Sequence, residues 1–277
     1  MTTSNRRREE LLVYEFHGLQ PPRDEPDDSA FLGIWPETPY YYLFFAGEPG
    51  EGLCRWVSMQ QGWVVRDTYR VAYEDWQQVG RGWIEVGPFS IALGPETMSS
   101  SKTGGAEGIS LWIDPGLVFG SGVHGSTRGC LLAVADLYRR ERPARVVDMG
   151  TGTGILAVSC GMLGATRVVA VDRTPLAVRT AAKNVRRNRL QGRVTLLVAE
   201  DLGILRGSSD LLIMNLELPI LKQLLAREEW LAYPKVILSG FLENQWHKLQ
   251  EYIPSAYYLR GRKTIDGWMT MTLARDA

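Results

Sequence analysis

Three glycines alternate with threonines at residues 150–154, between a β-branched run and a segment with helical spacing. Glycines at alternate positions let a backbone turn sharply and approach a ligand closely. Asp172 ends the next β-branched run, 22 residues after Gly150. A carboxylate at that position can accept hydrogen bonds from both hydroxyls of a ribose. Gly150, Gly152, Gly154 and Asp172 therefore predict a site for a cofactor that contains adenosine.

The spacing of these glycines separates two classes of adenosine cofactor. Dinucleotide-binding folds carry G-x-G-x-x-G, in which the start of a helix faces a pyrophosphate. This chain instead reads G-x-G-x-G, with Asp148 two residues before the first glycine. A carboxylate there suits the cationic sulfonium and ammonium groups of S-adenosylmethionine and would repel a pyrophosphate. We therefore expect S-adenosylmethionine as the cofactor, with Asp201, at the end of the third predicted strand, near its adenine.

The elements that must position these residues alternate along the second half of the chain. The predicted strands cover residues 145–150, 167–172, 194–201, 210–216 and 235–241, and the predicted helices cover 155–165, 175–190, 219–230 and 243–252. This alternation predicts an α/β fold, a doubly wound, Rossmann-like and mostly parallel sheet with helices on both faces. Two closing strands, 256–265 and 268–274, are separated by Asp266-Gly267. That hairpin signal predicts one antiparallel closing strand.

The first part of the chain has a different pattern, and we predict two domains. Strand-like runs cover residues 11–18, 31–35, 40–46 and 63–76, and a short helix is expected at 53–61. This pattern predicts a smaller α+β substrate-recognition domain over residues 1–75, before a cofactor-binding domain over 81–277. The boundary is expected at 73–80, and 94–108 is expected to form a long loop because it is rich in Gly and Ser. Five tryptophans fall before residue 84, and either core packing or an aromatic recognition surface would explain them.

Residues 113–134 (IDPGLVFGSGVHGSTRGCLLAV) resemble the signature of the PrmA family, methyltransferases of the large-subunit ribosomal protein eleven. That signature typically reads DPG-x-AFG-T-G-x-H-x-TT. The resemblance continues through the glycine loop to Asp266-Gly267-Trp268, over about residues 107–277. It implies a class I methyltransferase that uses S-adenosylmethionine. The first 75 residues match poorly and give no signal for the long first helix of the family's ferredoxin-like recognition domain.

The resemblance also implies the residues of the site. The implied cofactor contacts are Thr127, Gly150, Asp172 and Asn215, and we add Phe119 from the same signature. Asn215 would also be the catalytic residue, because a neutral amide can orient an amine without adding a charge. Alternatives remain open, since Thr127 could only cap a helix and Asn215 could only end its strand. His124 is expected to order its loop rather than to act as a base.

The predicted reaction transfers a methyl group to a protein amine, a lysine side chain or an N-terminal amine, in a substrate such as a large-subunit ribosomal protein. Two alternatives stay open. The chain could methylate another protein or a small-molecule amine, or it could bind the cofactor without catalysis and act through protein interaction.

Composition narrows the partners. The 31 basic and 31 acidic residues cancel, so no overall field attracts nucleic acid or an anionic membrane. The basic stretch at 183–193 is expected to be a solvated helix face. Three widely spaced cysteines without a CxxC pair predict no metal site. The first residues do not resemble a signal peptide, and no apolar run is long enough to span a membrane. We therefore expect a cytoplasmic protein with a protein substrate and no direct contact with nucleic acid or membrane.

Overall fold

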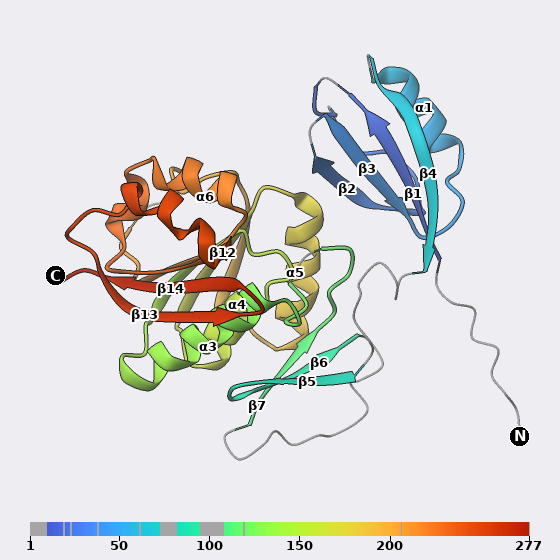
Figure 1. Cartoon of the computed structure of the whole chain (residues 1–277). Helices are drawn as coiled ribbons and strands as arrows, with labels where there is room; N and C mark the ends of the chain where they lie inside the picture. Colours follow the sequence, from blue (N-terminus) through green and yellow to red (C-terminus); the bar gives the residue numbers. More distant parts are fainter. Residues whose placement is uncertain are drawn as a thin grey trace, which may run out of the picture. The chain divides into compact units, whose positions relative to one another are not determined.

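The structure is a computed structural model, and the chain divides into two compact units (Figure 1). The small unit contains residues 1–80 and 174–176, and the large unit contains 81–173 and 177–277. The residues that the structure describes are 10–18, 20–22, 24–37, 39–60, 62–72, 82–94, 108–118, 120–205 and 207–276. The expected boundary at 73–80 and nearly all of the expected loop at 94–108 lie outside these residues.

The large unit is built around a seven-stranded sheet. Its strands are β8 (Arg145–Met149), β9 (Arg167–Asp172), β10 (Val194–Val198), β11 (Leu211–Asn215), β12 (Lys235–Leu242), β13 (Tyr258–Ile265) and β14 (Trp268–Ala274). They lie in the order β10-β9-β8-β11-β12-β14-β13. Strands β8 to β12 are parallel to one another, and β14 is antiparallel to both of its neighbours. The predicted fold class, with one antiparallel closing strand, is confirmed.

Helices cover both faces of this sheet. The helices are α3 (Gly125–Arg140), α4 (Ile155–Met162), α5 (Pro175–Arg187) and α6 (Leu218–Leu225). Alternate residues of β8, β11 and β12 form one core with α6 and the turns that follow it. Helix α3 packs against β12, β13 and β14, on the side of the sheet opposite α6 (Figure 1). The central strands are apolar on both faces because both faces are covered.

Two predicted helices are shorter or of another type. The helix expected at 219–230 ends at Leu225, where the buried Trp230 indole donates to the Leu225 carbonyl at 3.0 Å. A 3₁₀ turn, η2 (Glu229–Ala232), follows. The single helix expected at 243–252 does not form. This stretch instead forms two 3₁₀ turns, η3 (Glu243–Lys248) and η4 (Gln250–Tyr252). Its apolar residues Trp246, Leu249 and Tyr252 recur every third residue, which suits the three-residue turn of a 3₁₀ helix.

A small sheet precedes the signature segment. It consists of β5 (Gly82–Val86), β6 (Phe89–Leu93) and β7 (Ile109–Ile113), in that order. Strand β6 is antiparallel to β5 and parallel to β7. Because β7 ends at Ile113, this sheet fixes the position of the chain at the start of residues 114–124. We call residues 114–124, between β7 and α3, the β7–α3 segment.

In its described residues, the small unit has four antiparallel strands and one helix. Its elements are β1 (Glu10–His17), β2 (Phe31–Glu37), β3 (Tyr40–Phe45), α1 (Glu51–Met59) and β4 (Val64–Ala72). The strand order is β2-β3-β1-β4, and α1 packs on one face through Leu53 and Trp56. The described residues between β1 and β2 contain no helix.

Two tryptophans hold the chain between β1 and β2 in place. The Trp56 indole donates to the Asp24 carboxylate at 2.8 Å, and the Trp63 indole donates to the Gln20 carbonyl at 3.2 Å. Both side chains are buried, at 2% and 8% exposed, and their rings contact each other edge to face. For these two residues, packing rather than an exposed recognition surface is therefore the correct interpretation, whereas Trp76 lies outside the described residues.

Candidate cofactor site

The candidate site lies at the carboxyl edge of the large sheet, where the strand order reverses. Gly150 directly follows β8, Asp172 ends β9 and Asn215 ends β11. Strand β8 pairs with β9 on one side and with β11 on the other. In open α/β sheets, ligands bind outside the carboxyl ends of the strands at such a switch point. The structure thus brings three of the predicted residues to the same edge.

The glycine loop has a backbone that requires glycine. Gly150, Gly152 and Gly154 have φ values of 78°, 54° and 82°, a region that other residues rarely adopt. A Cβ on Gly150 would lie 2.1 Å from a methyl group of Leu216. The amides of Gly150 and Thr151 both donate to the Val171 carbonyl, at 2.8 and 2.9 Å. The loop is therefore held against β9 and β11 in one conformation.

Asp172 lies beside this loop. Its Oδ2 accepts a hydrogen bond from the Gly152 amide at 3.0 Å. The bond orients the carboxylate at the end of β9, the position expected for contact with a ribose. The glycine loop and Asp172 are thus hydrogen-bonded to each other, although Gly152 and Asp172 are 20 residues apart in the sequence.

Asp148 is a buried acid beneath the loop, with 1% of its surface exposed. Its Oδ2 accepts hydrogen bonds from the Thr151 hydroxyl at 2.7 Å and from the Ala157 amide at 3.1 Å. Its Oδ1 has no hydrogen-bond partner among the described residues. Burial and, to a smaller extent, the nearby charge of Asp172 together raise the pKa of Asp148 to about 6, against the lowering effect of its two hydrogen bonds. A cationic ligand would favour the ionised form of this acid.

Asn215, at the end of β11, contacts Thr127 in α3. The Asn215 amide nitrogen donates to the Thr127 hydroxyl at 3.3 Å. The Asn215 Oδ1 is buried and has no hydrogen-bond partner among the described residues. An unpaired buried acceptor is costly unless a ligand supplies the donor. This oxygen therefore fits a site for an N–H or O–H group of a ligand.

The start of α3 excludes one alternative for Thr127. Thr127 is the third residue of the helix and is fully buried, whereas the N-cap is His124, whose Nδ1 accepts from the Ser126 amide at 3.4 Å. Thr127 is therefore not a cap. The His124 ring also lies 4.5 Å from the Trp268 ring, between centroids, and burial lowers the pKa of His124. These contacts are those of a neutral histidine that orders its loop.

The other two predicted cofactor residues are Asp201 and Phe119. Asp201 follows β10, and its carboxylate accepts from Arg227 at 2.5 Å and from the Gly203 amide at 2.9 Å. Arg227 lowers the pKa of Asp201. A contact of this carboxylate with adenine stays a prediction, and it would compete with the ion pair. Phe119 lies outside the described residues.

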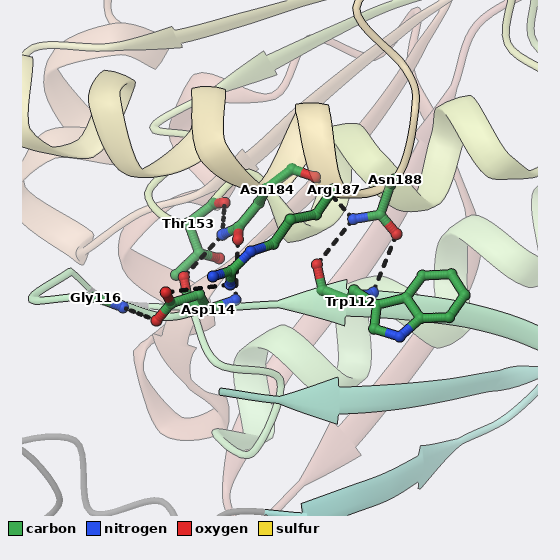
Figure 2. A network of polar contacts seen from close by, with 7 residues as sticks. All are labelled: Trp112, Asp114, Gly116, Thr153, Asn184, Arg187 and Asn188. Atoms are coloured by element: carbon green, nitrogen blue, oxygen red, sulfur yellow. Dashed lines mark hydrogen bonds and ion pairs between the residues drawn. The ribbon is translucent and has the colours of Figure 1, made fainter. Parts of the chain in front are cut away.

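Sequence reasoning missed a polar network behind the loop (Figure 2). The Thr153 hydroxyl donates to the Gly120 carbonyl at 2.6 Å, and the buried Asn184 amide on α5 donates to the Thr153 carbonyl at 2.8 Å. Asn188 directly follows the end of α5 and bonds to Trp112 of β7. Two asparagines four residues apart in the predicted helix at 175–190 are the signal that could have found this network.

In the described part of the chain, no group of three or more His, Cys, Asp or Glu side chains could hold a metal ion. No helix there is long and apolar enough to cross a membrane.

Known proteins resemble this chain over most of its length. The model of the family "Ribosomal protein L11 methyltransferase (PrmA)" matches residues 70–276. A ribosomal protein L11 methyltransferase of Brucella suis is 34% identical over 176 residues, which are 60% of this chain and 60% of that protein. The one of Rhizobium rhizogenes is 37% identical over 180 residues, which are 62% of this chain and 61% of that protein. The chain thus matches about 60% of the length of these curated relatives.

A solved structure has the same fold. It is a ribosomal protein L11 methylase from Lactobacillus delbrueckii subsp. bulgaricus, with a TM-score of 0.60 and 24% identity. The similarity covers 70% of this chain and 99% of that one. The family match extends over about three quarters of the chain and includes the glycine loop, Asp172 and Asn215. The chain therefore belongs to the ribosomal protein L11 methyltransferase (PrmA) family.

Proposed function

We propose that the chain is an S-adenosylmethionine-dependent N-methyltransferase that acts on a protein amine, with a ribosomal protein of the L11 type as its substrate. The observation that carries this proposal is the buried, unpaired oxygen of Asn215 at the carboxyl edge of β11, beside a strand that leads into the glycine loop. Family membership gives the reaction type, and the relatives named as L11 methyltransferases give the substrate class.

The donor set fits the cofactor. The glycine loop packs tightly, since a Cβ on Gly150 would clash with Leu216 and one on Gly154 would crowd Ala181, and Asp172 offers its carboxylate at the ribose position. Asp148 is a buried acid that a cationic cofactor would help to ionise. S-adenosylmethionine supplies an activated methyl group on its sulfonium when it is bound. The residues Thr127, Gly150, Gly152, Gly154, Asp172 and Asn215 would hold it.

The protein's own contribution is to hold a neutral amine in place. A free lysine amine has a pKa near ~10.4 and is mostly protonated at neutral pH, so it must lose a proton before it can react. Burial and a nearby cation both favour the neutral amine. The Asn215 oxygen can accept a hydrogen bond from that amine, and Thr127 fixes the orientation of the amide. Positioning of this kind is what a reaction with an already activated methyl group requires.

We also assign substrate selection to the small unit and the reaction to the cytoplasm. The small unit lacks a helix between β1 and β2 in its described residues, and tryptophans hold that stretch instead. This departure from the family's recognition domain favours a second candidate, in which the acceptor is an amine of another protein. The cofactor and the chemistry are the same in both candidates.

The test is a labelling experiment on the full chain. The protein is incubated with methyl-labelled S-adenosylmethionine and purified L11, and separately with total protein from cells, and labelled residues are located by mass spectrometry. Label on an L11 amine supports the proposal, and label on another protein supports the second candidate. Asp172→Ala serves as a control that should reduce labelling at limiting concentrations of the cofactor. Cofactor binding without any labelled product would instead indicate a binding protein without catalysis, and no cofactor binding would reject the proposal.

A further inference from the structure

We propose that Asn184 is a positioning residue that fastens the β7–α3 segment to the glycine loop, so that cofactor binding depends on its side-chain amide. The inference rests on the proposed function, because it assumes that the glycine loop binds S-adenosylmethionine. It concerns a residue of α5 that lies on neither of the strands that carry Asp172 and Asn215.

The Asn184 side chain bridges two separate loops (Figure 2). Its Oδ1 accepts from the Asp114 amide at 2.9 Å, and its Nδ2 donates to the Asp114 carbonyl at 2.9 Å. The same Nδ2 donates to the Thr153 carbonyl, in the glycine loop, at 2.8 Å. Both N–H groups of the amide are therefore used, and the side chain is fully buried. One amide thus joins the first residue of the β7–α3 segment to the glycine loop.

A second bond joins the same two parts of the chain. The Thr153 hydroxyl donates to the Gly120 carbonyl at 2.6 Å, and Thr153 is fully buried. Gly120 has a φ of 109°, and a Cβ there would lie 3.0 Å from the Thr153 hydroxyl oxygen. The segment therefore approaches the glycine loop as closely as a backbone without a side chain allows. The segment is therefore held at two residues, at Asp114 by Asn184 and at Gly120 by Thr153.

The other end of the segment leads to the acceptor side of the site. Helix α3 begins directly after it, and the third residue of that helix is Thr127, which receives the Asn215 amide. The β7–α3 segment thus links the glycine loop, to which it is hydrogen-bonded, with the Thr127–Asn215 pair at its other end. Loosening the segment from the loop would disturb the cofactor side first, because the bonds of Asn184 and Thr153 end there.

Asn188 provides the matched comparison. It directly follows the last residue of α5, four residues after Asn184, and it is nearly as buried, at 6% exposed. Its Oδ1 accepts from the Trp112 amide at 3.0 Å, and its Nδ2 donates to the Trp112 carbonyl at 2.8 Å. It therefore holds β7 as Asn184 holds Asp114, and its side-chain bonds go to Trp112 and to the Asn184 carbonyl rather than to the glycine loop. Its second Nδ2 bond goes to the Asn184 carbonyl.

The experiment compares Asn184→Ala with Asn188→Ala in the full chain. Three quantities are measured: the affinities for S-adenosylmethionine and S-adenosylhomocysteine by calorimetry, the thermal midpoint, and hydrogen exchange of residues 114–124. Both variants should lose stability to a similar extent, because each leaves buried backbone groups unpaired. Asn184→Ala should also weaken cofactor binding by ~10-fold or more, whereas Asn188→Ala should change it by less than ~3-fold. The KM for the cofactor should rise in Asn184→Ala with a smaller change in kcat.

A second variant keeps the test decisive if Asn184→Ala does not fold. Thr153→Val has nearly the same shape as the natural residue. It removes the bond to the Gly120 carbonyl and the long 3.4 Å bond from the Ile155 amide, so it should speed hydrogen exchange in the segment and weaken cofactor binding. Equal weakening by Asn184→Ala and Asn188→Ala, or unchanged exchange in the segment, would overturn the inference. Failure of the unaltered chain to bind either cofactor form would instead count against the proposed function.

Discussion

The amide of Asn215, at the end of β11, donates to the hydroxyl of Thr127 in α3 at 3.3 Å, across 88 residues of sequence. This bond turns the amide so that its oxygen remains buried without a partner among the described residues. Such an arrangement contributes little to folding, because the oxygen is desolvated and unpaired. It is suited to a ligand that brings its own donor.

Asn215→Ala should therefore impair turnover more than folding. We expect kcat to fall by roughly 10- to 100-fold, since the amine or cofactor loses an orienting acceptor. The free energy of unfolding should change by no more than about 1 kcal/mol, because one weak neutral hydrogen bond is lost. Turnover and thermal unfolding of the same preparation check this. A variant that unfolds readily but has normal activity per folded molecule would show that Asn215 only ends its strand.

Asp172→Ala should weaken binding of S-adenosylmethionine by ~1–3 kcal/mol, as expected for hydrogen bonds to a charged group. Part of the loss would come from the Gly152 amide, which loses its acceptor. Calorimetry with S-adenosylmethionine measures the change, and Glu251→Ala, at an exposed position outside the site, is the control. Equal affinity of the natural protein for NAD would contradict the cofactor assignment.

Asp148 should make the stability of the cofactor-free protein depend on pH. Burial raises its pKa from 3.8 to about 6 in the folded state. Its contribution to stability is therefore fully present below about pH 4 and is lost as pH rises through about 6. Relative to Asp148→Asn, the natural protein should lose roughly 1–3 kcal/mol of unfolding free energy between these values. Denaturant titrations of both proteins from pH 4 to 7 measure this difference, and a constant difference would contradict it.

The same acid should couple cofactor binding to pH. A cationic cofactor favours the ionised carboxylate, so affinity should increase as pH rises from 5 to 7 and protons should be released on binding near pH 6. Calorimetry in buffers with different ionisation enthalpies detects the released protons. In Asp148→Asn the release should disappear and the pH dependence should flatten. An unchanged pH profile in that variant would assign the dependence to another group.

Asp201 and Arg227 allow a test of the predicted adenine contact. If the Asp201 carboxylate meets the adenine, Arg227→Ala should free it and strengthen cofactor binding, whereas Asp201→Ala should weaken it. If Asp201 serves only its ion pair and the Gly203 amide, neither substitution should change the affinity by more than ~2-fold, because exposed ion pairs contribute little. Calorimetry on the two variants distinguishes these outcomes.

The role of the small unit can be tested by removing it. A chain that begins at residue 81 contains the seven-stranded sheet and all of the predicted cofactor residues. It should bind S-adenosylmethionine with nearly unchanged affinity and should lose methylation of the protein substrate, because the acceptor amine would no longer be held in line. Retained methylation of the protein would show that the small unit does not select the substrate.

The sequence by itself determined the local features of the site. The alternating glycines, the acid that ends the next strand, the β-branched runs of β8 and β9 and the apolar run of β11 are readable because each depends on residues close together in the chain. The signature at 113–134 was sufficient to indicate the family. Backbone conformation and hydrophobic period are local properties, and they carry this information directly.

Only the tertiary structure decided which distant groups meet. Three contacts join residues that are 88, 70 and 26 positions apart. They are the hydrogen bond of Asn215 to Thr127, the hydrogen bonds of Asn184 with Asp114 and the ion pair of Arg227 with Asp201. The two 3₁₀ turns at 243–252 were also decided there, because Leu249 is drawn into the core at a three-residue spacing. Hydrogen-bond partners across such separations are chosen by how the elements pack, and a linear pattern of residue types does not encode that choice.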